Sequence, residues 1–223
     1  MTRRALFLVL PFALAVPAAY GLAFAYAGYP LELGPLLIGA LGWVLALVLR
    51  APVGLAGLKI TGSQESAQRW VVASSGPLEE SVRLAALLLV GRDLPTALWL
   101  GLGWAAIEVG YAIANGFAMA ALASRTDPEA ERARAMLPPS AFAASAPWWG
   151  VVERIWASAL HIGFTLMLAA APILWVVTVP LHTLTNVTFV RLGQRRSMLI
   201  VSGLGLLFGA IILAGGLALH RIG

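Results

Sequence analysis

The sequence contains no cysteine and few charged residues. Without cysteine, the chain can form neither a disulfide nor a catalytic or metal-binding thiolate. Only 11% of its residues are charged and 60% are apolar, against about 25% and about 45–50% in a soluble domain. No stretch is polar enough to form a separate soluble domain, so we expect residues 1–223 to form a single integral membrane domain.

The net charge of +5 does not indicate a nucleic-acid-binding protein. The basic residues are spread over the ends of apolar segments, where such residues orient a membrane protein. The expected partner is therefore the lipid bilayer, and nucleic acid is not a predicted partner.

Apolar runs recur along the whole chain, and a bilayer core needs about 20 apolar residues per helix. The runs cover residues 5–27, 32–49, 70–91, 95–122, 151–169, 171–190 and 197–219. They predict an all-α fold, a polytopic membrane helix bundle of about seven transmembrane helices. The first run is longer than the ~7–15-residue core of a signal peptide, so we interpret it as a retained helix.

Arginines predict the orientation of the bundle. With the N-terminus in the cytoplasm, eleven basic residues lie inside and only Arg92 and Arg221 lie outside. The eleven are Arg3, Arg4, Arg50, Lys59, Arg69, Arg125, Arg132, Arg134, Arg191, Arg195 and Arg196. This bias follows the positive-inside rule and supports an odd number of helices. Many of these residues fall in two predicted linkers, residues 50–69 and 123–150.

Ionisable residues within the apolar runs mark the candidate site. Each costs about 2.5–3.5 kcal/mol at the centre of a membrane helix, so such residues indicate function. They are Glu79, Glu80, Arg83, Glu108, Glu153, Arg154, His161 and His182. They come from four successive segments within about residues 70–190, whereas segments 5–49 and 197–219 contribute none at mid-depth. We therefore expect one polar site in a four-helix core, flanked by scaffold helices.

Two histidines and a glutamate at a common depth suit a metal site. At 1.5 Å per residue, Glu108, His161 and His182 all fall close to the middle of their helices. A catalytic zinc takes three such ligands and keeps an open position for water. The sequence therefore predicts Glu108, His161 and His182 as zinc ligands, although no HExxH motif is present.

The remaining polar residues of this core suit peptide-bond hydrolysis. Glu79 or Glu80 would act as a general base toward the bound water, and Asn186 would donate to the oxyanion. Arg83 follows Glu79 by four residues and Glu80 by three, so either carboxylate can meet the guanidinium. The four-residue spacing to Arg83 favours Glu79 as the general base, but Glu80 remains an alternative.

Four short motifs resemble those of the YhfC-type membrane metalloproteases, in the wider superfamily of CAAX-processing and PrsW-type proteases. The motifs are Glu79-Glu80-Ser81-Val82-Arg83, Trp104 with Glu108, Glu153-Arg154 with His161, and His182 with Asn186. They occur in matching order within residues 70–190. The resemblance implies an intramembrane metalloprotease in which the double-glutamate motif activates water. It also implies a multi-pass protein of a bacterial cell membrane, with a membrane protein or peptide as substrate.

One position departs from the CAAX branch of that superfamily. Glu108 stands where that branch carries histidine, which argues against a direct transfer of its mechanism and against prenylated substrates. Each residue also has a purely structural interpretation. Glu79, Glu80 and Arg83 would then form an ion pair, and Asn186 would bridge helices. We interpret Glu153 and Arg154 as an ion pair at the membrane interface in preference to catalytic groups.

Two other functions remain open at this point. A non-catalytic membrane scaffold or immunity protein could keep the same fold, although loss of a site residue would be expected and none is missing. A small proton-coupled transporter could use buried Glu and His residues as a relay. Against a transporter, 223 residues without an internal repeat is small for such a fold. The sequence sets neither the substrate nor the oligomeric state.

Overall fold

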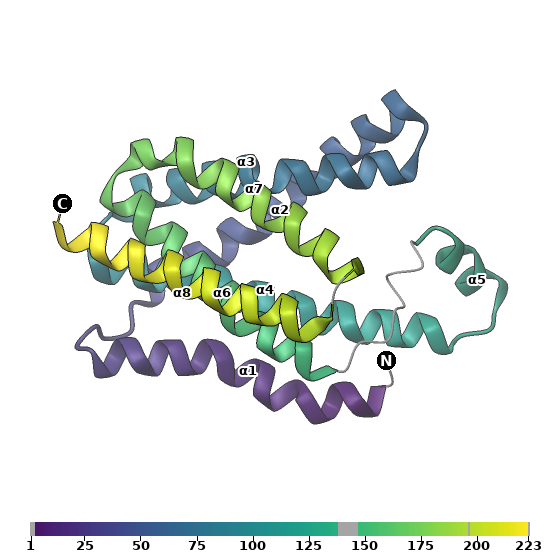
Figure 1. The fold of residues 1–223 in the computed structure, drawn as a ribbon, viewed down its shortest axis with the longest axis horizontal. Helices are drawn as coiled ribbons and strands as arrows, with labels where there is room; N and C mark the ends of the chain where they lie inside the picture. The colour runs from purple at the N-terminus through teal and green to yellow at the C-terminus, as the bar shows by residue number, and fades with distance from the viewer. Residues whose placement is uncertain (1–2, 138–146, 196, 223) are drawn as a thin grey trace.

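The computed structural model describes residues 3–137, 147–195 and 197–222, and these fold into helices with no strand. The helices are α1 (Arg3–Tyr26), α2 (Leu33–Thr61), α3 (Gln64–Val90), α4 (Leu94–Ser124), α5 (Pro128–Ala135), α6 (Pro147–Ala170), the 3-10 turn η2 (Pro172–Leu174), α7 (Trp175–Arg195) and α8 (Met198–Ile222). The long helices lie side by side in a bundle (Figure 1). The prediction of an all-α, polytopic membrane bundle is confirmed.

Six of these helices are long and apolar enough to cross a membrane: α1, α2, α4, α6, α7 with η2, and α8. Helix α3 was the seventh predicted span. Helix α3 is not apolar enough to count among these six. Glu79, Glu80 and Arg83 lie in its middle, and Glu65 and Arg69 lie near its start. The polar groups in its middle are buried within the bundle. A seventh crossing by α3 therefore stays a prediction.

The prediction of a linker over residues 50–69 is wrong. Helix α2 continues through Arg50 to Thr61, and α3 begins only three residues later. Gly62 ends α2 in the left-handed conformation (φ 64°), which glycine adopts without steric cost. The Ser63 side chain then accepts a hydrogen bond from the Ser66 amide and starts α3. The two helices form a tight hairpin because an αL stop and an N-cap lie next to each other.

The predicted linker over residues 123–150 is partly helical. Asp127 accepts a hydrogen bond from the Ala130 amide and starts the short helix α5, with Pro128 in its first turn. Residues 138–146 lie outside the described part of the chain. The Trp148 ring meets Phe12 edge-on, with ring centroids 4.8 Å apart.

Helix α6 is the centre of the bundle. It packs against α8, α4 and α1, while α3 lies between α2 and α7. Glycines allow two of these approaches. A Cβ on Gly103 of α4 would lie 1.9 Å from the Leu36 carbonyl oxygen of α2, and one on Gly76 of α3 would lie 2.2 Å from Thr183 Oγ1 of α7. Such close backbone approach is how membrane helices gain packing energy.

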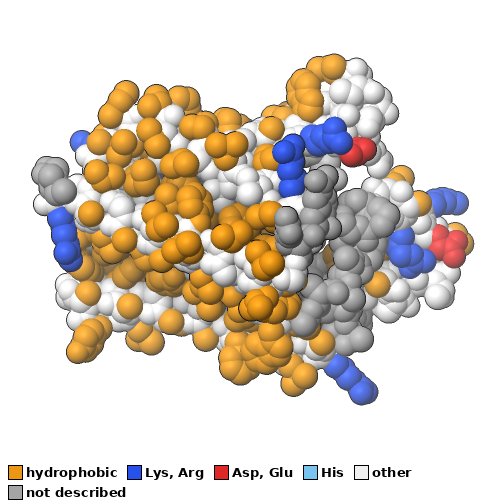
Figure 2. Space-filling view, in the orientation of Figure 1, with side chains coloured by type: hydrophobic (Ala, Val, Ile, Leu, Met, Phe, Trp, Pro, Cys, Tyr) orange, Lys and Arg blue, Asp and Glu red, His pale blue; other side chains and the backbone are white. Residues whose placement is uncertain are grey.

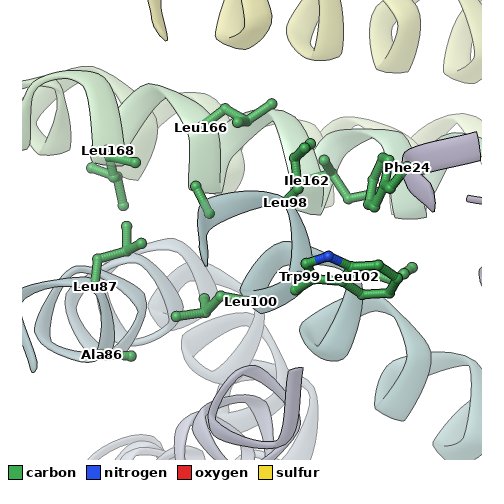
Figure 3. Packing of buried hydrophobic residues seen from close by; sticks show 12 residues of the cluster. Phe24, Ala86, Leu87, Leu98, Trp99, Leu100, Leu102, Ile162, Leu166 and Leu168 are labelled. Atoms are coloured by element: carbon green, nitrogen blue, oxygen red, sulfur yellow. The ribbon is translucent and has the colours of Figure 1, made fainter. Parts of the chain in front are cut away.

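A dense apolar core fills one end of the bundle. Leu87, Leu98, Leu100, Ile162 and Leu166 meet there from α3, α4 and α6 (Figure 3). The ends of α3 and α6 and the start of α4 build this end, which the arginine pattern assigns to the outside. The core closes the bundle at this end.

The outer surface is that of a lipid-facing protein. Large apolar side chains such as Leu8, Leu22, Leu89 and Leu199 are well exposed. Figure 2 shows hydrophobic side chains over most of the visible face. The α2–α3 hairpin, α5 and the N-terminus share one end of the molecule, and the C-terminus lies at the other (Figure 1). The basic residues of the hairpin and of α5 therefore gather at one end.

Candidate active site

A cavity of about 840 Å³ opens in the half of the bundle opposite the dense apolar core, and we call it the main cavity. Five of the seven predicted site residues line it: Glu79, Glu108, His161, His182 and Asn186. Glu80 and Arg83 are fully buried beside it and do not form its wall. The structure therefore brings all seven residues into one region, as expected from their common depth.

Glu79, His161 and His182 form the group that could hold a metal. One carboxylate oxygen and one nitrogen of each ring all lie within 4.8 Å of one another, and all three side chains are buried. This set differs from the predicted ligands in one member, since Glu79 takes the place of Glu108. The reason is the rotation of α4, which directs Glu108 toward His161 and Arg154.

Glu80 orients His182. Its Oε1 lies 2.6 Å from His182 Nδ1, and an ionised carboxylate there accepts the ring proton. The other ring nitrogen, Nε2, then carries the lone pair and lies 3.7 Å from Glu79 Oε1. A histidine that donates one N–H to a carboxylate and presents the other nitrogen is the usual arrangement of a metal ligand. Because Glu80 is absent from the cavity wall, it is placed to position His182, not to attack a substrate.

Arg83 is completely buried and tied to several groups. Its Nη2 lies 3.2 Å from Glu80 Oε1 and 3.0 Å from His161 Nδ1. Its Nη1 donates to the His161 carbonyl oxygen at 2.9 Å and to Thr165 Oγ1 at 2.8 Å. The guanidinium also lies 4.2 Å from the centre of the Trp104 ring, within the range of a cation–π interaction. Arg83 thus joins α3, α4 and α6.

Glu79 has different partners from those that the sequence suggested. Arg83 is 4.0 Å from it, farther than from Glu80, so the four-residue spacing does not single out Glu79. Instead Arg50 Nη2 forms an ion pair with Glu79 Oε1, and Trp104 Nε1 donates to Oε2 at 3.0 Å.

Sequence reasoning missed Arg50 as a site residue, because an arginine after an apolar run reads as the end of a membrane helix. Trp104 was noticed only as part of a motif. Pro52, Gly54 and Gly57 follow Arg50, so nothing in the sequence indicated that the helix continues to Thr61.

His161 is held at both ring nitrogens. Arginine can only donate, so the contact with Arg83 leaves Nδ1 without a proton. Nε2 therefore carries the proton and donates to Glu108 Oε2 at 2.5 Å. Glu108 is held in turn by Arg154 at 2.8 Å and by Trp43 Nε1 at 3.2 Å. This arrangement keeps the Glu108 carboxylate ionised and fixes the orientation of the imidazole.

The Glu153–Arg154 pair is more than an interfacial ion pair. Arg154 Nη2 donates to Glu153 at 2.5 Å, and its Nη1 donates to Glu108 inside the bundle. Both residues line the main cavity. The pair therefore connects the His161 side of the site with the mouth of the cavity.

Asn186 lies one helical turn from His182 and lines the main cavity. Its Nδ2 donates to Ser75 Oγ at 2.8 Å, which fixes the amide between α7 and α3. A primary amide has two N–H donors, so the second N–H remains for a substrate. Both the bridging role and the substrate-binding role expected of Asn186 are compatible with this geometry.

No family model, curated protein or solved structure matches this chain. The resemblance to the YhfC-type metalloproteases therefore stays a prediction that rests on the four motifs. In the structure, residues from all four motifs line the main cavity.

Proposed function

We propose that this protein is an intramembrane peptidase of a cell membrane. It would hydrolyse a peptide bond of a membrane protein or membrane-associated peptide, with a bound metal ion. The single observation that carries the proposal is the buried group of Glu79, His161 and His182, whose ligand atoms lie within 4.8 Å on the wall of a large cavity.

The donor set fits zinc. Two imidazoles and one carboxylate are a common ligand set of catalytic zinc, with a fourth position for water. Glu80 accepts the proton of the His182 ring, as an outer carboxylate does in such sites. Both ring nitrogens of His161 already have partners, so a metal bound by His161 would have to replace Arg83 or Glu108 at one of them. A zinc ion bound there would lower the pKa of a bound water and polarise the substrate carbonyl.

The chain's own residues have distinct roles in this proposal. Glu79, His161 and His182 hold the metal, and Glu80 and Arg83 position them. Glu108 lines the cavity and is the carboxylate that takes up a proton. Asn186 donates an N–H to the developing oxyanion. Glu108 thus exchanges roles with Glu79 relative to the interpretation from the sequence alone.

Elemental analysis of the detergent-purified protein tests the proposal. We expect near-stoichiometric zinc, lost in His161→Ala and His182→Ala and kept in the control His220→Ala, which removes a histidine far along α8. Glu79→Gln should lose more metal than Glu108→Gln, because only Glu79 belongs to the group. A folded protein that takes up no zinc even after supplementation would contradict the metal mechanism. It would leave the Glu108–His161 pair as the basis of a metal-free hydrolase.

A further inference from the structure

A second cavity of about 400 Å³ adjoins the main cavity, and we call it the side cavity. The two share the wall residues Arg50, Val71, Glu153, Trp156 and Asn186. The main cavity extends from these residues toward α2 and α4, with Tyr111 and Met119 on its wall. The side cavity extends toward α7 and α8, with Phe189 and Met198 on its wall. Together they form a cleft with two arms.

The junction of the two arms lies beside the reacting groups, which line the main cavity. Arg50 belongs to both walls and forms the ion pair with Glu79. Asn186 also belongs to both walls and lies one turn from His182. A chain whose scissile bond lies at Glu79 and His182 therefore has space on both sides of that bond.

Both arms lie in the half of the bundle nearer the arginine-rich end. Their walls come from the middle of α2, from the middle and last turns of α4 and α7, from the early turns through the middle of α3 and α6, and from the start of α8; this end also carries α5 (Figure 1). Tyr111 and Asn115 on the main-cavity wall are exposed. The positive-inside rule assigns this end to the cytoplasm.

The side cavity is unsuited to a chain terminus. Apart from the shared Arg50 and Glu153, its wall is apolar or neutral, and its apolar members include Val72, Trp156, Phe189, Met198 and Val201. Arg50 and Glu153 already pair with Glu79 and Arg154. Among the wall residues that the structure describes, a terminal carboxylate or ammonium group would meet no free counter-charge, and burying an unpaired charge is costly. An internal segment has no such charge.

We propose that the cleft binds an extended internal segment of a polypeptide, which enters from the arginine-rich side and crosses both arms. The site would then cut within a chain and would not trim an end. Cleavage of the bound segment rests on the proposed peptidase function, but the mode of binding can be tested without any activity.

The absence of cysteine makes the test direct, because any introduced thiol is unique. Ala112→Cys reports on the main cavity and Val72→Cys on the side cavity, and both side chains are half-buried on their walls. Leu100→Cys, in the closed apolar core, is the control. A membrane-impermeant maleimide is applied to inside-out and right-side-out vesicles. We expect the first two thiols to react only in inside-out vesicles and the control in neither. Reaction from the other side, or at neither cavity position, overturns the proposed route.

Protection by a peptide tests the occupant. The probe is an apolar twelve-residue peptide with an acetylated N-terminus and an amidated C-terminus, added to the cysteine variants in a Glu79→Gln background. We expect the peptide to slow labelling at both positions at least tenfold. Protection of only one arm, of neither arm, or only by a peptide with a free terminus overturns the proposal of an internal segment. These outcomes do not depend on zinc or turnover, so they are distinct from a failure of the peptidase proposal.

Discussion

Glu80 Oε1 lies 2.6 Å from His182 Nδ1, and neither side chain has appreciable access to the surroundings. The contact fixes the ring so that Nε2 faces Glu79. Adjacent residues of α3 thus differ in role. Glu79 lines the cavity, whereas Glu80 contributes to the site by orienting His182.

Glu80→Gln tests that division. The amide is nearly isosteric, but it cannot accept the ring proton as strongly as a carboxylate, so His182 is less basic and less well oriented. We expect zinc affinity to fall about 10–100-fold, the effect typical of outer-sphere partners. Competition with a chromogenic chelator measures this. Glu65→Gln, at an exposed position of the same helix, is the control and should bind zinc normally.

Arg50→Met should destabilise the protein more than the double variant Arg50→Met/Glu79→Gln. Removing the arginine alone leaves Glu79 without its closest positive partner, and breaking a buried pair in this way costs about 3–5 kcal/mol. Replacing Glu79 as well removes the unpaired charge. Unfolding in detergent, followed by circular dichroism, gives both values. Equal losses in the single and double variants would show that the two residues are not coupled.

Gly103→Ala should separate α2 from α4. A Cβ at this position would lie 1.9 Å from the Leu36 carbonyl oxygen, so the helices must move apart. Overpacking of this kind costs about 1–3 kcal/mol. Gly110→Ala on the same helix meets no atom within 4 Å and should be neutral or slightly stabilising. Thermal unfolding of the two variants in the same detergent compares them, and similar midpoints would contradict the close approach.

Asp127 should make the stability of α5 depend on acid pH. Hydrogen bonds from the Arg125 side chain and the Ala130 amide lower the pKa of Asp127 from 3.8 to about 2. A pKa lowered by folding means a contribution that is complete above pH 3.8 and is lost as the pH falls toward about 2. Hydrogen exchange of the α5 amides, corrected for its intrinsic pH dependence, should therefore accelerate over this range.

Asp127→Asn is the control for that titration. Asparagine keeps a capping oxygen but has no proton to take up, so the exchange rates should lose the part of their pH dependence that Asp127 supplies. If the variant and the natural chain show the same acid-induced acceleration, Glu129 or Glu131 of the same helix is responsible instead.

The sequence by itself determined the membrane bundle and the common depth of most candidate site residues. Long apolar runs must be helices in lipid, because lipid cannot satisfy a free backbone N–H or C=O. Ionisable residues at mid-helix must turn inward for the same reason. Depth along a helix can be counted from the sequence, so Glu79, His161 and His182 could be placed in one layer.

Only the tertiary structure decided which of these residues face one another. The rotation of each helix about its axis depends on its packing, as where Gly103 lets α2 approach α4. That rotation directs Glu79 toward the histidines and Glu108 toward Arg154, which the four-residue spacing of Glu79 and Arg83 could not reveal. The packing also brings Arg50 from a predicted linker to Glu79 and leaves two joined cavities at one end of the bundle. Spacing fixes the contacts within a helix, and packing fixes those between helices.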